Sequence, residues 1–208
     1  MESEFKYNFI KSKTPEKDIT LLLFHGTGGD ENDLIPIGKM FGENINLLGI
    51  RGKILEHGMP RYFRRIGEGV FDIEDLKYRT KELYSFLNSL PSEIKIDKKK
   101  LVALGYSNGA NIAGSLLLMY PDFLKGLIQL RPMKPYEIEG SLKINNTPVF
   151  ISSGKKDFAV NETDSLNWAD ELRNYGADVS YNLLNTGHNL TNEDISLAVE
   201  WFKEKIKN

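Results

Sequence analysis

The chain contains no cysteine, which excludes three kinds of chemistry at once. Disulfide cross-links, thiolate nucleophiles and cysteine-ligated metal sites all need that residue. The chain is also short of histidine, since only His25, His57 and His188 are present, and any histidine base is one of these three. A length of 208 residues is enough for one hydrophobic core, so we expect a single domain over residues 1–208.

Neither sign of charge is in excess, because 27 lysines and arginines against 29 aspartates and glutamates leave a net charge of -2. That balance argues against nucleic acid or an anionic membrane as the main partner. No apolar run approaches the roughly 20 residues that span a bilayer, so we expect no membrane insertion. Residues Met1–Phe5 lack the basic and apolar regions of a secretory signal, and we expect a cytoplasmic protein.

Basic residues nevertheless cluster at two places, with Arg61, Arg64 and Arg65 in one and Lys98–Lys100 in the other. Charge runs of this kind are usually solvated, and we predict a solvated loop and a solvated approach to a strand. A second interpretation is that the three arginines favour substrates with an acidic leaving group. We keep the solvated interpretation as the prediction and do not commit to the second.

Short apolar strands alternate with longer helical patterns along the chain. This alternation predicts an α/β fold, with a mostly parallel sheet covered by helices on both faces. No inserted group of helices indicates a large cap domain. The predicted strands are 19–24, 45–50, 101–104, 126–130, 149–153 and 179–184, with 5–10 as an antiparallel edge strand, and the predicted helices are 32–41, 72–90, 108–119, 161–175 and 191–207.

Two long connections, residues 51–71 and 131–147, interrupt this alternation. Both are expected to leave the sheet at the carboxyl ends of strands, where open α/β sheets bind ligands. Long loops in compact domains are usually functional. Their apolar residues are therefore candidates to line an acyl or aryl pocket, namely Met59, Tyr62, Phe63, Phe71 and Met133.

The main chemical signal is the pentapeptide Gly105-Tyr106-Ser107-Asn108-Gly109, which stands between an apolar run and a helical pattern. A Gly-x-Ser-x-Gly sequence in a strand-to-helix turn is typical of a nucleophile elbow. The glycines remove side chains that would collide in so tight a turn, and the serine Oγ is then exposed above the sheet edge. We therefore predict that Ser107 is a nucleophile.

A serine nucleophile needs a base to remove its proton. His188 follows the last predicted strand and precedes the last predicted helix, which is where a hydrolase with this elbow carries its base. His25 instead precedes a glycine-rich turn, and His57 lies in the first long connection. We predict His188 as the base.

The base in turn needs a carboxylate on its other ring nitrogen. Asp157 follows the predicted strand 149–153 at a suitable distance. Asp164 and Asp170 fall within a predicted helix, where helix-start or surface roles suffice, and Asp178 begins a strand at the wrong end of the sheet. With Asp157 chosen, nucleophile, acid and base follow in the order of the α/β-hydrolase fold.

The anion that forms on an attacked carbonyl needs hydrogen-bond donors. We predict the backbone N–H groups of Thr27 and Asn108, because Thr27 lies in the glycine-rich segment 25–30 and Asn108 follows the nucleophile. The glycine-rich segment is not a phosphate loop, since it lacks a Gly-Lys-Ser/Thr ending and the Gly-x-Gly-x-x-Gly spacing. The acidic residues Asp30, Glu31 and Asp33 would also repel phosphate.

Together these segments resemble the phospholipase/carboxylesterase family of α/β-hydrolases, which includes bacterial carboxylesterases and acyl-protein thioesterases. The resemblance rests on residues 25–30, 105–110, 153–157 and 187–188. It implies a single-domain α/β-hydrolase fold, a serine esterase or thioesterase, and no metal or organic cofactor. Many family members dimerise, so it also makes a homodimer a candidate assembly.

Three further segments look like a subgroup of small bacterial hydrolases associated with responses to hydroquinone and aromatic compounds. They are Arg51-Gly52, residues 61–65 and residues 131–133. The family usually has a proline before the Arg-Gly pair, where this chain has Ile50.

We therefore predict a hydrolase that cleaves carboxylic esters or thioesters of small acyl groups through a covalent acyl-enzyme on Ser107. Two alternatives remain at this point: a slow-turnover ligand-sensing protein on a hydrolase scaffold, and an acyl-protein thioesterase. Dienelactone hydrolase chemistry is disfavoured, because its usual nucleophile is cysteine.

Overall fold

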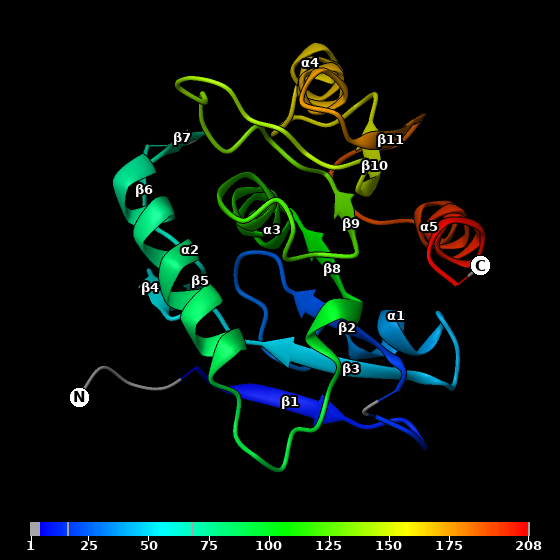
Figure 1. Ribbon diagram of the computed structural model, residues 1–208. Coiled ribbons are helices and arrows are strands. Elements are labelled where there is room, and N and C mark those ends of the chain that lie inside the picture. Colours follow the sequence, from blue (N-terminus) through cyan, green and yellow to red (C-terminus); the bar gives the residue numbers. More distant parts are fainter. Residues whose placement is uncertain (1–4, 16, 68, 208) are drawn as a thin grey trace.

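Figure 1 shows the protein as a computed structural model, in which residues 5–15, 17–67 and 69–207 are described. Within these residues, one sheet of seven strands runs in the order β1-β3-β2-β8-β9-β10-β11. All neighbours pair in parallel except β1 (Tyr7–Ile10), which runs antiparallel to β3 at one edge. The predicted α/β architecture and its antiparallel edge strand are confirmed. The prediction that no secretory signal is present falls largely on residues 1–4, outside the described part.

The central strands match their predicted positions closely, because their apolar runs are buried on both faces of a parallel sheet. Leu22 and Phe24 of β2 pack into one hydrophobic cluster, whereas Leu21 and Leu23 pack into another on the opposite face. The edge strand β11 is only partly buried along most of its length. The bounds are β2 (Ile19–Phe24), β3 (Ile45–Ile50), β8 (Leu101–Tyr106), β9 (Gly126–Leu130), β10 (Pro148–Gly154) and β11 (Asp178–Leu184).

Five α-helices within the described residues cover the sheet, with α2, α3 and α4 on one face and α1 and α5 on the other (Figure 1). Each packs its apolar side chains into the cluster on its own face. The first is shorter than predicted and begins just before Pro36, which stands in its first turn and favours a helix start there. The bounds are α1 (Ile35–Lys39), α2 (Ile73–Asn88), α3 (Asn108–Met119), α4 (Glu162–Asn174) and α5 (Asn192–Lys205).

The connection over residues 51–71 is not the unstructured loop that its sequence suggests. It forms one hairpin from β4 (Ile54–Glu56) and β5 (Met59–Arg61), and a second from β6 (Arg65–Gly67) and β7 (Val70–Phe71). The first hairpin turns at His57 and Gly58, both at positive φ, as a two-residue hairpin turn requires. Strands of two or three residues carry too little periodicity for sequence reasoning to detect.

Among the described residues, none of the helices is both long enough and apolar enough to cross a bilayer. The basic run Lys98–Lys100 forms a one-turn 3-10 helix, η1, that leads directly into β8. None of its residues is buried, so the predicted solvated approach to a strand is confirmed there.

The packing of α2 on the sheet predicts the effect of a cavity in the core. Leu83 is fully buried on α2, and truncating a buried leucine to alanine removes contacts that the surroundings replace only in part. We expect Leu83→Ala to lower the free energy of unfolding by about 2–5 kcal/mol, measured by urea denaturation. The matched control Leu55→Ala, at a position 71% exposed, should change it little. Equal losses for the two variants would contradict this account of the core.

Candidate active site

Ser107 occupies a strained turn between β8 and α3. Its φ of 51° and ψ of -115° lie outside the regions that non-glycine residues usually adopt, which costs of order 1–3 kcal/mol. A Cβ on Gly105 would lie 2.3 Å from the carbonyl oxygen of Gly109, and one on Gly109 would lie 2.0 Å from that of Phe24. Only glycine fits at either place. The Ser107 N–H donates to the carbonyl of Leu130 at 2.9 Å, which anchors the turn to β9.

A continuous chain of hydrogen-bonding side chains starts at Ser107. Its Oγ lies 3.0 Å from Nε2 of His188, and Nδ1 of the same ring lies 2.8 Å from Oδ2 of Asp157. The Asp157 side chain is almost fully buried, and its Oδ1 accepts from the N–H groups of Ala159 and Val160. The structure therefore brings together the three side chains that the sequence singled out. Such a chain can move a proton from the serine to the imidazole.

The three residues meet because parallel strands end at the same edge of the sheet. Ser107 follows β8, whereas Asp157 and His188 follow the paired strands β10 and β11. The loops after those two strands touch closely, since a Cβ on Gly154 would lie 2.4 Å from the carbonyl oxygen of Gly187. Glycine at position 154 thus lets the loop with Asp157 approach the loop with His188.

A buried arginine holds the loop that carries His188. Nε of Arg131 donates to the carbonyl of Gly187 at 3.0 Å, and Nη2 donates to that of Asn189 at 3.3 Å. The guanidinium therefore binds the backbone on both sides of His188. Its nitrogens also bind Asp194 at 2.7 and 2.9 Å, in an ion pair whose side chains are both fully buried.

Asp194 links this ion pair to the start of α5. Besides Arg131, its carboxylate accepts from Ser152 and from both the N–H and the hydroxyl of Thr191, which caps the helix. Burial alone would raise the pKa of Asp194, but the hydrogen bonds from Arg131, Ser152 and Thr191 outweigh it and lower that pKa below its usual range.

The backbone N–H groups of Thr27 and Asn108 have no acceptor among the described residues. Both residues line the cavity that contains Ser107. The glycine segment is held in place by its neighbours, since Gly28 N–H donates to the carbonyl of Pro60 at 2.9 Å. The side chain of Asn108 also has a structural contact, accepting from the Tyr62 N–H at 2.8 Å. The predicted oxyanion donors are thus free to bind a ligand.

The other two histidines have different surroundings. Nε2 of the buried His25 accepts from the Gly52 N–H at 3.0 Å, so we assign the ring proton to Nδ1, which donates to the Gly26 carbonyl at 2.6 Å. Burial lowers the pKa of His25, which favours the neutral ring. His57 is exposed in the turn of the β4–β5 hairpin.

The cavity over Ser107 has a volume of about 440 Å³. Of the five residues predicted to line a substrate pocket, Phe71 and Met133 do so. That prediction is wrong for Tyr62 and Phe63, whose side chains pack in the hydrophobic core, where the Tyr62 hydroxyl donates to the Ile50 carbonyl. Met59 lies outside the lining as well, because its side chain is exposed.

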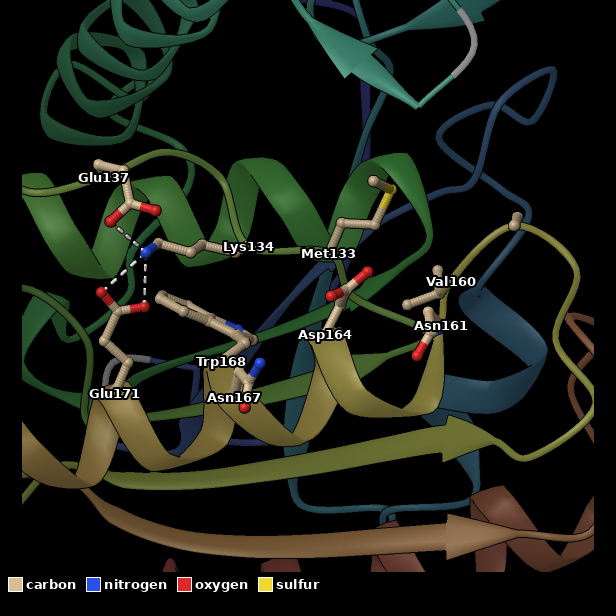
Figure 2. Close-up of a pocket in the computed structure, with 10 residues that line it drawn as sticks. Met133, Lys134, Glu137, Val160, Asn161, Asp164, Asn167, Trp168 and Glu171 are labelled. Atoms are coloured by element: carbon tan, nitrogen blue, oxygen red, sulfur yellow. Dashed lines mark hydrogen bonds and ion pairs between the residues drawn. The ribbon is translucent and has the colours of Figure 1, made fainter.

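A second cavity of about 340 Å³ lies beside the first. The two share Met133, Ala159 and Val160, which therefore form the wall between them. Figure 2 shows Lys134 at the far end of the second cavity, paired with Glu137 and Glu171. Both of these carboxylates offset the lysine charge, so we expect no net attraction for an anion there.

The three clustered arginines, Arg61, Arg64 and Arg65, differ in exposure. The prediction of a solvated loop is wrong for Arg61, which is only 5% exposed and donates through Nη1 to the Thr27 hydroxyl at 2.7 Å. The side chain of Arg65 is 31% exposed, and both residues pair with Glu56. The Arg64 side chain is 61% exposed and pairs with Asp72 and Asp75.

Sequence reasoning missed the ion pair between Arg131 and Asp194 and the burial of Arg61. Arg131 follows an apolar strand directly. That position indicates the carboxyl edge of the sheet, but it does not indicate that Arg131 binds the loop of His188. Asp194 reads as an ordinary residue of a capping box, a role it also performs. No group of acidic and histidine residues arranged for metal binding occurs in the described part of the chain.

Comparisons with known proteins show what this chain as a whole is similar to. No family model matches the chain. A protein of Bacillus subtilis (strain 168) named "Putative hydrolase MhqD" is 44% identical over 189 residues, covering 91% of this chain and 94% of the relative. The crystal structure of the Bacillus cereus carboxylesterase is 42% identical with a TM-score of 0.93, covering 98% of this chain and 96% of that one. The structure of YahD with malic acid is 30% identical with a TM-score of 0.90, and the match covers 97% of this chain and 99% of that one.

The buried ion pair predicts both a stability loss and its pH dependence. We expect Asp194→Asn to lower the free energy of unfolding by about 3–5 kcal/mol at pH 7, because Arg131 loses its buried counter-charge. The folded pKa of Asp194 is lowered, so its stabilisation is present above the unfolded value of about 3.9 and is lost as pH falls through the folded value. The difference from wild type should therefore shrink below about pH 4.

Urea denaturation at several pH values measures this difference. Asp170→Asn is the matched control, because Asp170 lies exposed on α4 and pairs only at the surface with Arg173. If Asp194→Asn proved as stable as Asp170→Asn at pH 7, the ion pair would not stabilise the fold as argued.

Proposed function

The chain belongs to the phospholipase/carboxylesterase family of α/β-hydrolases, and from this premise we propose that Ser107, His188 and Asp157 hydrolyse carboxylic esters or thioesters of small acyl groups. The protein is a carboxylesterase-type hydrolase. The proposal adds the residues, the covalent route and the size of the substrate. The observation that carries it is the unbroken hydrogen-bonded chain from Asp157 through His188 to the Ser107 hydroxyl, at the surface of an open cavity.

In the first half-reaction, Oγ of Ser107 attacks the carbonyl carbon of the ester while Nε2 of His188 takes the hydroxyl proton. Nδ1 of His188 keeps its proton toward Asp157, which stabilises the imidazolium. The tetrahedral intermediate then collapses, the bond to the alcohol or thiol breaks, and His188 returns the proton to the leaving group. The acyl group stays on Ser107.

In the second half-reaction, a water molecule gives a proton to Nε2 of His188 as its oxygen attacks the acyl carbonyl. The new intermediate collapses by breaking the bond to Oγ, and the imidazole returns the proton to Ser107. A carboxylic acid leaves. In both intermediates the negative oxygen accepts from the N–H groups of Thr27 and Asn108, which have no acceptor among the described residues.

The volume of the cavity supports small acyl groups. About 440 Å³ lies at the low end of ligand pockets, which span roughly 300–1,000 Å³. The shared wall of Met133, Ala159 and Val160 separates this space from the second cavity. A single small acyl or aryl group fits this arrangement better than a long chain.

A slow-turnover ligand-sensing protein and an acyl-protein thioesterase are the alternatives from the sequence. A sensor with the same residues would stop after about one equivalent of product, whereas an esterase continues. Four further expectations from the sequence stay predictions: a cytoplasmic location, a homodimer, no nucleic-acid partner and no cofactor.

The test compares two histidines of the same chain on an activated ester such as p-nitrophenyl acetate. We expect His188→Ala and Ser107→Ala each to lower kcat by at least about 10^3, because each removes a member of the proton-transfer chain. His57→Ala is the matched control and should keep wild-type activity, since His57 is exposed and lies outside the cavity lining.

Labelling with a fluorophosphonate probe, followed by mass spectrometry, locates the nucleophile. We expect one adduct, on Ser107. An adduct on another residue, or undiminished turnover by Ser107→Ala, would overturn the proposal. Product release that halts at one equivalent would favour the ligand-sensing alternative.

A further inference from the structure

The wall of the Ser107 cavity is unusual in its charge. The described residues that line it include Arg61, Arg65 and Arg131, and no aspartate or glutamate. Arginine side chains stay protonated at any working pH, so each brings a full positive charge to the wall. A cavity for a purely apolar acyl group has no need of such a wall.

The charges of these arginines are only partly neutralised. Arg131 pairs with Asp194 and donates to backbone carbonyls, so its guanidinium is occupied. Arg61 and Arg65 instead share a single carboxylate, that of Glu56. Among the described residues, these two positive charges therefore share one negative charge.

The guanidinium groups of Arg61 and Arg65 also keep free donors. Arg61 uses Nε toward Glu56 and the Phe63 carbonyl and Nη1 toward Thr27, and its Nη2 has no partner among the described residues. Arg65 pairs through Nε, and its two terminal nitrogens likewise have none there. Arg61 is nearly buried, so an anion that reached it would be screened little by water.

Two amide side chains add donors to the same cavity. Oδ1 of Asn111 accepts from the Met133 N–H at 2.8 Å, which fixes the amide so that Nδ2 is the free end. Nδ2 of Asn108 is buried and has no partner. Buried polar groups without partners are rare in folded proteins, and Asn108 carries one on the wall of this cavity, which Asn111 also lines.

The arginines lie close to the proposed reaction centre. Arg61 contacts the hydroxyl of Thr27, and the N–H of Thr27 is one of the two proposed oxyanion donors. A negative group bound by Arg61 and Arg65 would therefore share one cavity with the carbonyl that Ser107 attacks.

We propose that this cavity selects esters that carry a second, ionised carboxylate group, which Arg61 and Arg65 bind. The substrate class is then the half ester of a short dicarboxylic acid or a close chemical relative. This inference rests on the proposed function for the reaction at Ser107, but the recognition of the carboxylate is a separate property of the cavity wall.

The test uses two esters of equal size, monomethyl glutarate and the methyl ester of glutaramic acid. They differ only in that a carboxylate replaces a primary amide at the far end. We expect wild-type kcat/KM to favour the carboxylate ester by about tenfold or more, because hydrogen bonds between charged groups are roughly twice as strong as neutral ones. A ratio at or below one would overturn the inference.

Neighbouring arginines provide the matched variants. Arg65→Gln should lower the ratio of the two kcat/KM values by about tenfold, since it removes one charge from the wall. Arg64→Gln should leave the ratio unchanged, because Arg64 is exposed and pairs with Asp72 and Asp75 outside the lining. Equal ratios in the two variants would contradict the assignment to Arg65.

Binding to Ser107→Ala separates this inference from the proposed function. We expect calorimetry on that variant to show tighter binding of monomethyl glutarate than of the amide ester. If this preference holds while wild type hydrolyses neither ester, the carboxylate site stands and the proposed chemistry fails. If wild type hydrolyses both esters equally through Ser107 and the variant binds both equally, the chemistry stands and the carboxylate site fails.

Discussion

The buried ion pair between Arg131 and Asp194 joins the parts of the molecule on which the site depends. It connects the end of β9, the start of α5 and the loop on both sides of His188. Removing two charges from water is costly, and the pair is tolerable because hydrogen bonds satisfy nearly every atom of it. The hydrogen bonds of Arg131 to Gly187 and Asn189 also hold the backbone of the His188 loop, in which Nε2 faces the Ser107 hydroxyl.

A second constraint acts at Ser107 itself. The positive φ of this residue is unfavourable, and it persists because the glycines at 105 and 109 let β8, α3 and β2 approach closely. The strain places Oγ at the head of the helix, beside the free N–H of Asn108. Both constraints act on the hydrogen bond between His188 and Ser107. The contacts of Arg131 position the imidazole, and the strained turn positions the hydroxyl.

The two small hairpins between β3 and α2 give the cavity its chemical character. They bring Arg61 under the glycine-rich segment, where it contacts Thr27, and they hold Arg65 at the wall. The same segment sends Tyr62 and Phe63 into the core, away from the substrate. One short stretch of chain therefore supplies both packing and charge.

The sequence by itself determined the α/β fold and the three residues proposed for the chemistry. Apolar runs mark the strands, and the glycines around Ser107 mark its turn. Asp157 and His188 could be found because parallel strands deliver the residues after them to one edge. Only the tertiary structure decided that Arg131 meets Asp194, 63 positions away in the chain, and that Arg61 is buried against Thr27. The physical reason is that such contacts depend on how side chains pack between distant segments, which neither periodicity nor local spacing records.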